Sequence, residues 1–133
     1  MKSNRAVGNA FEQELCDLLS AHGFWAKNMK QDSSGQPADV IAVRNKVAYL
    51  IDCKDCSGER FSLRRIEPNQ ETAMTMWEQC GNGQGWFAIK FSDEIYMMNY
   101  TKIARLANRC GSLKQDTIAC IAITFNEWVK KCE

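Results

Sequence analysis

The sequence predicts a mixed α/β fold in which helices pack against a β-sheet. Three observations lead to this prediction: a helical pattern near the N-terminus, two apolar strand-like runs joined by a short link, and a second helical pattern that ends in a glycine-rich segment. The resulting order, α-β-β-(β)-α-β-β-α, favours a mixed sheet with flanking helices. A chain of 133 residues, 45% hydrophobic and 25% charged, fits one domain over residues 1–133.

The first half of the chain is expected to contain a helix followed by a hairpin. Residues 8–21 place apolar side chains at helical spacing, and Gly23 is a plausible stop. Polar residues 28–36 predict a loop. The apolar runs 38–43 and 47–54 follow, and the short link between them predicts a β-hairpin.

The second half is expected to contain, in order, a short strand or extended loop (55–66), a helix (67–80), two strands (86–91 and 94–100), a short helix (101–109), another strand (117–125) and a closing helical turn. Pro68 suits the first turn of its helix. Thr101 is expected to cap the short helix.

Charged residues stand at the open end of the predicted hairpin. Asp52 and Lys54 share one face of their strand because strand side chains alternate. With a turn near 44–46, residue 39 pairs with about residue 51, so Asp39 should be a neighbour of Asp52. Two carboxylates held that close repel each other unless a cation lies between them. Oxygen ligands with room for water suit Mg²⁺ or Mn²⁺.

A third carboxylate, that of Glu12, belongs to the first helix. It lies beside Leu15, Cys16 and Leu19 at spacings of three, four and seven residues. Glu12 is therefore expected at the rim of the packed face, directed toward the sheet. Taken alone, Glu12 is better explained as a solvated helix carboxylate, as is expected for Glu14.

Four elements in this order resemble the PD-(D/E)XK nucleases. They are Gly8-Asn9-Ala10-Phe11-Glu12, Pro37-Ala38-Asp39, Asp52-Cys53-Lys54 and Gln70. Over roughly residues 5–100 the pattern is most similar to archaeal-type Holliday junction resolvases and the related RecU group. Two positions depart from it: Ala38 separates the proline from the aspartate, and Asp52 replaces the commoner glutamate.

The resemblance implies a restriction-endonuclease-like fold with an α-β-β-β-α-β core, and a role for each matched residue. Glu12, Asp39 and Asp52 would ligate Mg²⁺, with Mn²⁺ as a possible substitute, and the Cys53 carbonyl would complete the protein ligands. Lys54 would position or activate the attacking water.

Further residues are implied with alternatives left open. Gln70 would support Lys54, although a surface role is nearly as plausible. Ser33 and Ser34 lie where the family has a loop that can reach the scissile phosphate, but they also fit a plain loop. The basic residues Arg60, Arg64 and Arg65 could contact DNA phosphates or form a solvated edge.

The expected function is that of a metal-dependent DNA endonuclease, structure-selective and Holliday junction resolvase-like. Its partners would be branched DNA and a second copy of the chain, since a two-fold substrate needs two matched nicks. A net charge of +1 provides no general attraction for DNA. The alternatives are a repair or restriction-type nuclease of the same fold and a DNA-binding module that does not cut.

Seven cysteines and one histidine, His22, raise the question of a thiol or zinc site. Cys53 and Cys56 match C-x-x-C, but no second such pair exists and Cys53 lies inside a predicted strand. The thiols are therefore expected to be reduced packing residues. No apolar run reaches the roughly 20 residues of a membrane span, and no secretory signal is seen, so a cytoplasmic protein is expected.

Overall fold

The computed structural model describes residues 4–29, 38–56, 58 and 60–133, with side chains described from residue 10 onward. Its helices and strands are α1 (Asn4–Ala21), β1 (Trp25–Asn28), β2 (Val40–Arg44), β3 (Val47–Asp55), β4 (Arg60–Ser62), the 3₁₀ turn η1 (Leu63–Arg65), α2 (Pro68–Gln79), β5 (Trp86–Lys90), β6 (Ile95–Asn99), α3 (Tyr100–Ala107), β7 (Ser112–Lys114), α4 (Gln115–Ile121), β8 (Ile123–Thr124) and α5 (Phe125–Lys131).

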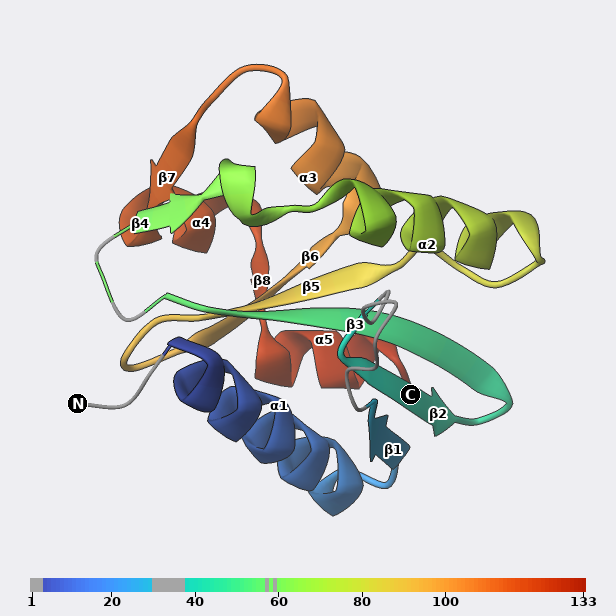
Figure 1. Ribbon diagram of the computed structural model, residues 1–133. Helices are drawn as coiled ribbons and strands as arrows, with labels where there is room; N and C mark the ends of the chain where they lie inside the picture. The colour runs from blue at the N-terminus through green and yellow to red at the C-terminus, as the bar shows by residue number, and fades with distance from the viewer. Residues whose placement is uncertain (1–3, 30–37, 57, 59) are drawn as a thin grey trace.

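The described strands form a central mixed sheet and a small second sheet (Figure 1). The central sheet has six strands in the order β1-β2-β3-β5-β6-β8, and the second sheet pairs β4 with β7. Strands β3 and β5 are parallel, while the other pairs are antiparallel. The parallel pair requires a crossover, which contains α2. The predicted fold class is therefore confirmed.

The β2–β3 hairpin forms as predicted and fixes the register of the strands near the candidate site. Its turn consists of Asn45 and Lys46, both with positive φ (54° and 68°). Positive φ at both central residues is typical of a type I′ turn, whose twist matches that of paired strands. The register runs from Arg44 opposite Val47 to Val40 opposite Ile51.

Each face of the central sheet is covered by its own helices and core. One core joins α1 and α5 to the sheet through residues such as Leu15, Ile51 and Trp128. The other joins α2, α3 and α4 to the opposite face, with Met74 and Ile118 among its members. Figure 1 shows α1 and α5 on one side of the sheet and α2, α3 and α4 on the other.

The predicted strand over residues 117–125 and the predicted cap at Thr101 are both wrong. In addition, two short strands are not predicted by the sequence. Residues 117–125, expected as a strand, form most of the helix α4 and the two-residue strand β8. In α4 the side chain of Ile118 is fully buried, and this packing outweighs the β-like composition. The cap of α3 is Asn99, whose Oδ1 accepts a hydrogen bond from the Lys102 N–H at 2.9 Å, and not Thr101.

The unpredicted strands are β1 and β7. Each is short, and each forms by pairing with a strand from elsewhere in the chain: β1 with β2, and β7 with β4.

Within the residues described, no helix is both long and apolar enough to cross a membrane.

Replacing Trp128 with alanine is expected to cost about 3–5 kcal/mol of unfolding free energy, as for other buried tryptophans. The Trp128 ring packs against those of Phe24, Tyr49, Trp86 and Phe125 at centroid distances of 5.1–6.3 Å. Its Nε1 finds no hydrogen-bond partner among the described residues, so the substitution loses packing and no polar contact.

Urea denaturation measures this effect. Trp25, which is 61% exposed, provides the control: its replacement with alanine should change stability by no more than about 0.5 kcal/mol. Equal destabilisation by the two substitutions would contradict the assignment of Trp128 to the core.

Candidate active site

The open end of the β2–β3 hairpin brings Asp39 and Asp52 together. The strand register places Val40 opposite Ile51, so one step further Asp39 lies opposite Asp52. The sequence places residue 39 opposite about residue 51, one position away from this register. The Asp39 N–H donates to the Ile51 carbonyl at 3.2 Å, and Asp39 Oδ2 accepts from the Cys53 N–H at 2.7 Å. These bonds hold Asp39 against β3.

Burial distinguishes this site from the rest of the described chain. Four of the described polar or charged side chains are buried, and all four are predicted site residues: Asp39 (7% exposed), Asp52 (0%), Lys54 (7%) and Gln70 (8%). Charged side chains are seldom buried unless they are paired. Their concentration at one place indicates a site that is maintained at a cost to stability.

The ammonium group of Lys54 is fixed by three oxygen atoms. It forms an ion pair with Asp52 Oδ2 at 2.9 Å and donates to the Arg65 carbonyl at 3.0 Å and Gln70 Oε1 at 3.2 Å. Two of its three N–H donors thus have hydrogen-bond acceptors, and the Asp52 carboxylate adds a close ion pair. The lysine is thus held in one orientation at the end of β3.

Gln70 connects strand β3 to helix α2. Its Nε2 donates to Asp52 Oδ1 at 3.0 Å, while its Oε1 accepts from Lys54 and also from the Glu67 N–H at 3.1 Å. Glu67 is the N-cap of α2, and the two residues form a capping box. Gln70 is therefore both a helix cap and a partner of the buried ion pair, and not a surface residue.

Glu12 approaches the pair from α1. Burial, the charge of Asp39 and a hydrogen bond with Asp39 raise the pKa of Glu12 to about 8, against a smaller lowering by Lys54. The predicted direction of Glu12 toward the sheet is thus borne out by its contact with Asp39. Carboxylates from α1, the segment before β2, and β3 therefore lie near one another, and Asp39 interacts with both of the others.

Asp52 also carries an electrostatic penalty. Burial and then the charge of Asp39 raise its pKa well above the usual value, while Lys54 lowers it. Asp52 Oδ2 makes no hydrogen bond of good geometry within the described chain, although the Lys54 ammonium lies 2.9 Å away. The ion pair therefore offsets only part of the repulsion, which a proton or an additional cation would relieve.

The donor set suits Mg²⁺ even though the side chains do not form a ready-made cage. As they stand, no three His, Cys, Asp or Glu side chains of the described residues converge closely enough to hold a metal. Mg²⁺, however, is commonly held by one or two carboxylates together with waters and substrate phosphates. The buried, incompletely satisfied oxygen of Asp52 and the nearby oxygens of Asp39 and Glu12 fit such a site.

The C-x-x-C thiols do not form a pair. Cys53 packs against the core on the α1 side of the sheet, whereas Cys56 belongs to the core on the opposite side. Burial raises the pKa of both thiols, which keeps them protonated. All seven cysteines are free, and the prediction that they are packing residues is correct for buried Cys16 and Cys56 but wrong for exposed Cys80 and Cys120.

The predicted basic residues separate into two kinds. Arg60 and Arg64 are exposed and could meet a phosphate. Arg65 also reaches the surface, but its Nη1 donates to the Asp55 carbonyl at 2.9 Å and lies 3.5 Å from Cys56 Sγ. It therefore ties η1 to the end of β3. Ser33 and Ser34 lie outside the described residues.

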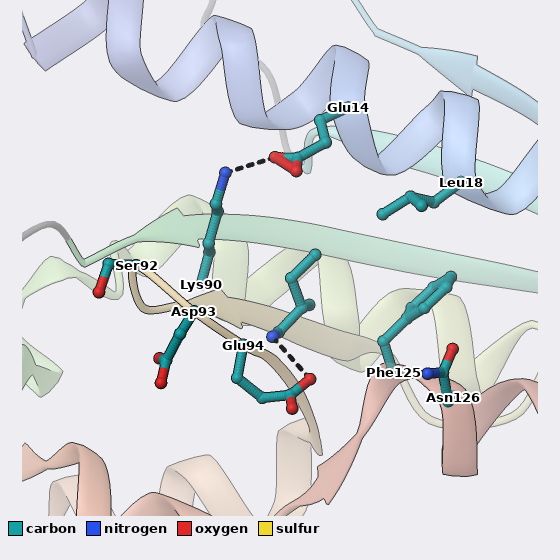
Figure 2. Close-up of a pocket in the computed structure, with 9 residues that line it drawn as sticks. Glu14, Leu18, Lys90, Ser92, Asp93, Glu94, Phe125 and Asn126 are labelled. Atoms are coloured by element: carbon teal, nitrogen blue, oxygen red, sulfur yellow. Dashed lines mark hydrogen bonds and ion pairs between the residues drawn. The ribbon is translucent and has the colours of Figure 1, made fainter.

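A second polar pocket near α1 is separate from this site. Figure 2 shows Lys90 of β5 reaching up to Glu14 of α1, with which it forms an ion pair. Glu14, expected to be solvated, is thus paired. The pocket, of about 290 Å³, is also lined by Asp93 and Glu94. Three carboxylates against one lysine disfavour a phosphate there.

The mixed sheet with its buried Asp-Asp-x-Lys cluster and a helix-borne glutamate defines a nuclease of the PD-(D/E)XK class. The model of one family, the archaeal Holliday junction resolvases (Hjc), matches residues 3–133. The chain belongs to this family and is a Holliday junction resolvase-like nuclease.

Comparison of structures agrees on the fold. The structure of Hjc from Archaeoglobus fulgidus, a Holliday junction resolvase from an archaeal hyperthermophile, matches with a TM-score of 0.69 at 16% identity, covering 92% of this chain and 95% of that chain. A protein of unknown function matches with a TM-score of 0.43 at 23% identity, over 72% of this chain and 52% of that chain. No curated protein sequence matches the chain.

Proposed function

We propose that the protein is a Mg²⁺-dependent, homodimeric endonuclease that nicks branched DNA at the cluster of Glu12, Asp39, Asp52 and Lys54. The observation that carries this proposal is the coincidence of burial and chemistry. The buried polar side chains of the described chain all belong to one connected cluster that contains two carboxylates and a lysine. Well-packed apolar residues often stabilise a fold as well as a buried ion pair does, so stability alone does not explain the cluster.

Glu12, Asp39 and Asp52, with the Cys53 carbonyl, would hold the metal. When bound, a divalent cation supplies a water of lowered pKa and positive charge for the phosphate oxygens. The protein's own contribution is the placement of these oxygens: Asp39 is held by two backbone bonds and Asp52 by Gln70. Rigid placement matters because hydrolysis requires an in-line approach.

Lys54 would stabilise the negative charge that develops on the phosphate during hydrolysis. Its ammonium lies 2.9 Å from Asp52 Oδ2, so it would lie near a phosphate held through a cation at that carboxylate. The Arg65 carbonyl and Gln70 Oε1 fix its direction. Gln70 and Arg65 are therefore proposed as positioning residues.

A cleavage assay with Mg²⁺ on four-way junctions, flaps, linear duplex and single strands tests the proposed function. We expect cleavage of the four-way junction, with Mn²⁺ able to substitute, and no effect of a zinc-selective chelator. Preferential cleavage of flaps or linear duplex would instead support the repair or restriction-type alternative. Junction binding without any cleavage in Mg²⁺ or Mn²⁺ would support a non-cleaving module and overturn the proposal.

Alanine substitutions of Arg65 and Arg64 are expected to affect cleavage differently, although the two residues are neighbours. Replacing Arg65 with alanine removes the link from η1 to the Asp55 carbonyl, which should loosen the Arg65 carbonyl that holds Lys54. We expect kcat to fall about tenfold, with a smaller change in affinity for the junction, because the loss affects positioning. The measurement is single-turnover cleavage together with equilibrium binding.

Arg64→Ala is the matched control. Arg64 is exposed, so its loss should weaken DNA binding slightly and leave kcat unchanged. If Arg65→Ala changed affinity alone, its role would be that of an ordinary phosphate contact.

We also propose that the enzyme works in the reducing cytoplasm. All seven cysteines are free, and exposed Cys80 and Cys120 are compatible with a compartment that keeps thiols reduced.

A further inference from the structure

The β4–β7 ribbon, formed by residues 60–62 and 112–114, has one buried face and one solvent face. Its middle residues, Phe61 (0% exposed) and Leu113 (7%), are paired and point into the core. Because side chains alternate along a strand, the flanking residues point the other way. Arg60 lies opposite Lys114, and Ser62 opposite Ser112.

The solvent face of the ribbon combines two cations with two hydroxyls. Arg60 Nη1 donates to Ser112 Oγ at 3.2 Å, which directs the guanidinium along this face. Among the described residues, no carboxylate forms an ion pair with Arg60 or Lys114. Like charges directly opposite each other destabilise a strand pair. The ribbon therefore carries a repulsion that an anion between the two side chains would relieve.

The ribbon also lies close to the candidate active site. Strand β4 starts five residues after Asp55, the last residue of β3, and η1, which holds Lys54, follows β4 directly. Five residues span at most about 18 Å, or about five base steps of a duplex at ~3.4 Å each. In the view of Figure 1, β4 and β7 lie above the left-hand end of β3.

We infer that the solvent face of the β4–β7 ribbon (Arg60, Ser62, Ser112 and Lys114) is a phosphate-binding surface for a duplex arm of the substrate. This inference rests on the proposed function and adds to it a contact from the C-terminal third of the chain. The partner fits by charge complementarity: closely spaced phosphates bind cations and hydroxyls without reading bases. A duplex cut at Asp52 and Lys54 would rest its backbone on this ribbon.

Lys114→Glu separates this role from a structural one, because it should weaken DNA binding without harming the fold. The new carboxylate would pair with Arg60 and remove the cross-strand repulsion. We expect a Tm equal to or above that of the wild type. We expect junction affinity to fall at least about tenfold at 0.1 M salt, and the salt dependence of log K to become less steep by about one unit or more.

Binding is measured by fluorescence anisotropy with a labelled four-way junction in EDTA over a range of salt concentrations. Lys130→Glu, at an exposed position in the last turn of α5, is the control that changes net charge equally. Its affinity should change much less. If Lys114→Glu lowered Tm, the neutral variant Lys114→Gln would decide the question by the same change in salt slope.

Unchanged affinity and slope in the Lys114 variants, or an equal loss in Lys130→Glu, would overturn the inference. If the wild type binds and cleaves the junction and the Lys114 variants bind it with the same affinity and salt slope, only the inference about the ribbon is wrong. A wild-type protein that neither binds nor cleaves the junction would instead refute the proposed function.

Discussion

Asp52→Asn is expected to abolish cleavage, lowering kcat by at least about 10²–10³-fold, while DNA binding is kept or strengthened. The amide is uncharged, so it binds a divalent cation weakly and no longer pairs with the Lys54 ammonium 2.9 Å away. Binding survives because the substitution removes a negative charge that repels phosphate. The two effects have opposite signs, and this distinguishes a catalytic carboxylate from a structural one.

The effect of Asp52→Asn on stability should be smaller than for an ordinary broken ion pair. Removing one partner of a buried pair costs about 3–5 kcal/mol. Here the carboxylate is also repelled by Asp39, which contributes to its raised pKa, so its removal relieves part of that cost. The variant should therefore fold well enough for binding to be measured.

Cleavage and binding are measured on the same four-way junction. Asp55→Asn is the control, since Asp55 ends the same strand and is bonded through its carbonyl oxygen to Arg65. It changes net charge equally and should leave cleavage nearly unchanged. Full activity of Asp52→Asn would rule out the proposed role of Asp52.

The protein is expected to be a homodimer that binds a four-way junction at least about 100-fold more tightly than linear duplex. One chain offers one proposed catalytic cluster, whereas a four-way junction has two symmetry-related scissile phosphates. A two-fold dimer would bind both arms, and linking two sites commonly raises affinity by about 10²–10⁴. A net charge of +1 gives little general attraction, so binding to linear duplex should be weak and salt-sensitive.

Sedimentation gives the oligomeric state, and competition between junction and linear DNA gives the preference. A monomer at working concentration, or equal affinity for both substrates, would contradict this prediction. The hydrolytic chemistry proposed for Asp52 and Lys54 would be unaffected by that result.

Local patterns predicted that Asp39, Asp52 and Lys54 lie close together. The alternation of strand side chains places Asp52 and Lys54 on one face, and the short link 44–46 brings Asp39 to Asp52. The helical phase of Glu12 places it at the rim of α1. Each of these inferences depends on residues close in sequence, where backbone periodicity fixes direction.

Periodicity did not decide how the cluster is supported: the family resemblance implied that Gln70 supports Lys54, and the tertiary structure added the remaining contacts. Gln70 reaches Lys54 and Asp52 across 16 and 18 residues, and the Arg65 carbonyl reaches Lys54 across 11. From residue type alone, neither a glutamine nor a backbone carbonyl is recognisable in a sequence as a lysine partner. Their contacts depend on where α2 and η1 pack against β3.

The same holds for the C-terminal third of the chain. Residues 117–125 have a strand-like composition, yet α4 forms there because Ile118 is buried against the sheet. Lys114 comes to lie opposite Arg60 through the pairing of β7 with β4, over more than 50 residues. Pairing between distant segments is set by the packing of the whole core, which periodicity along the chain does not encode.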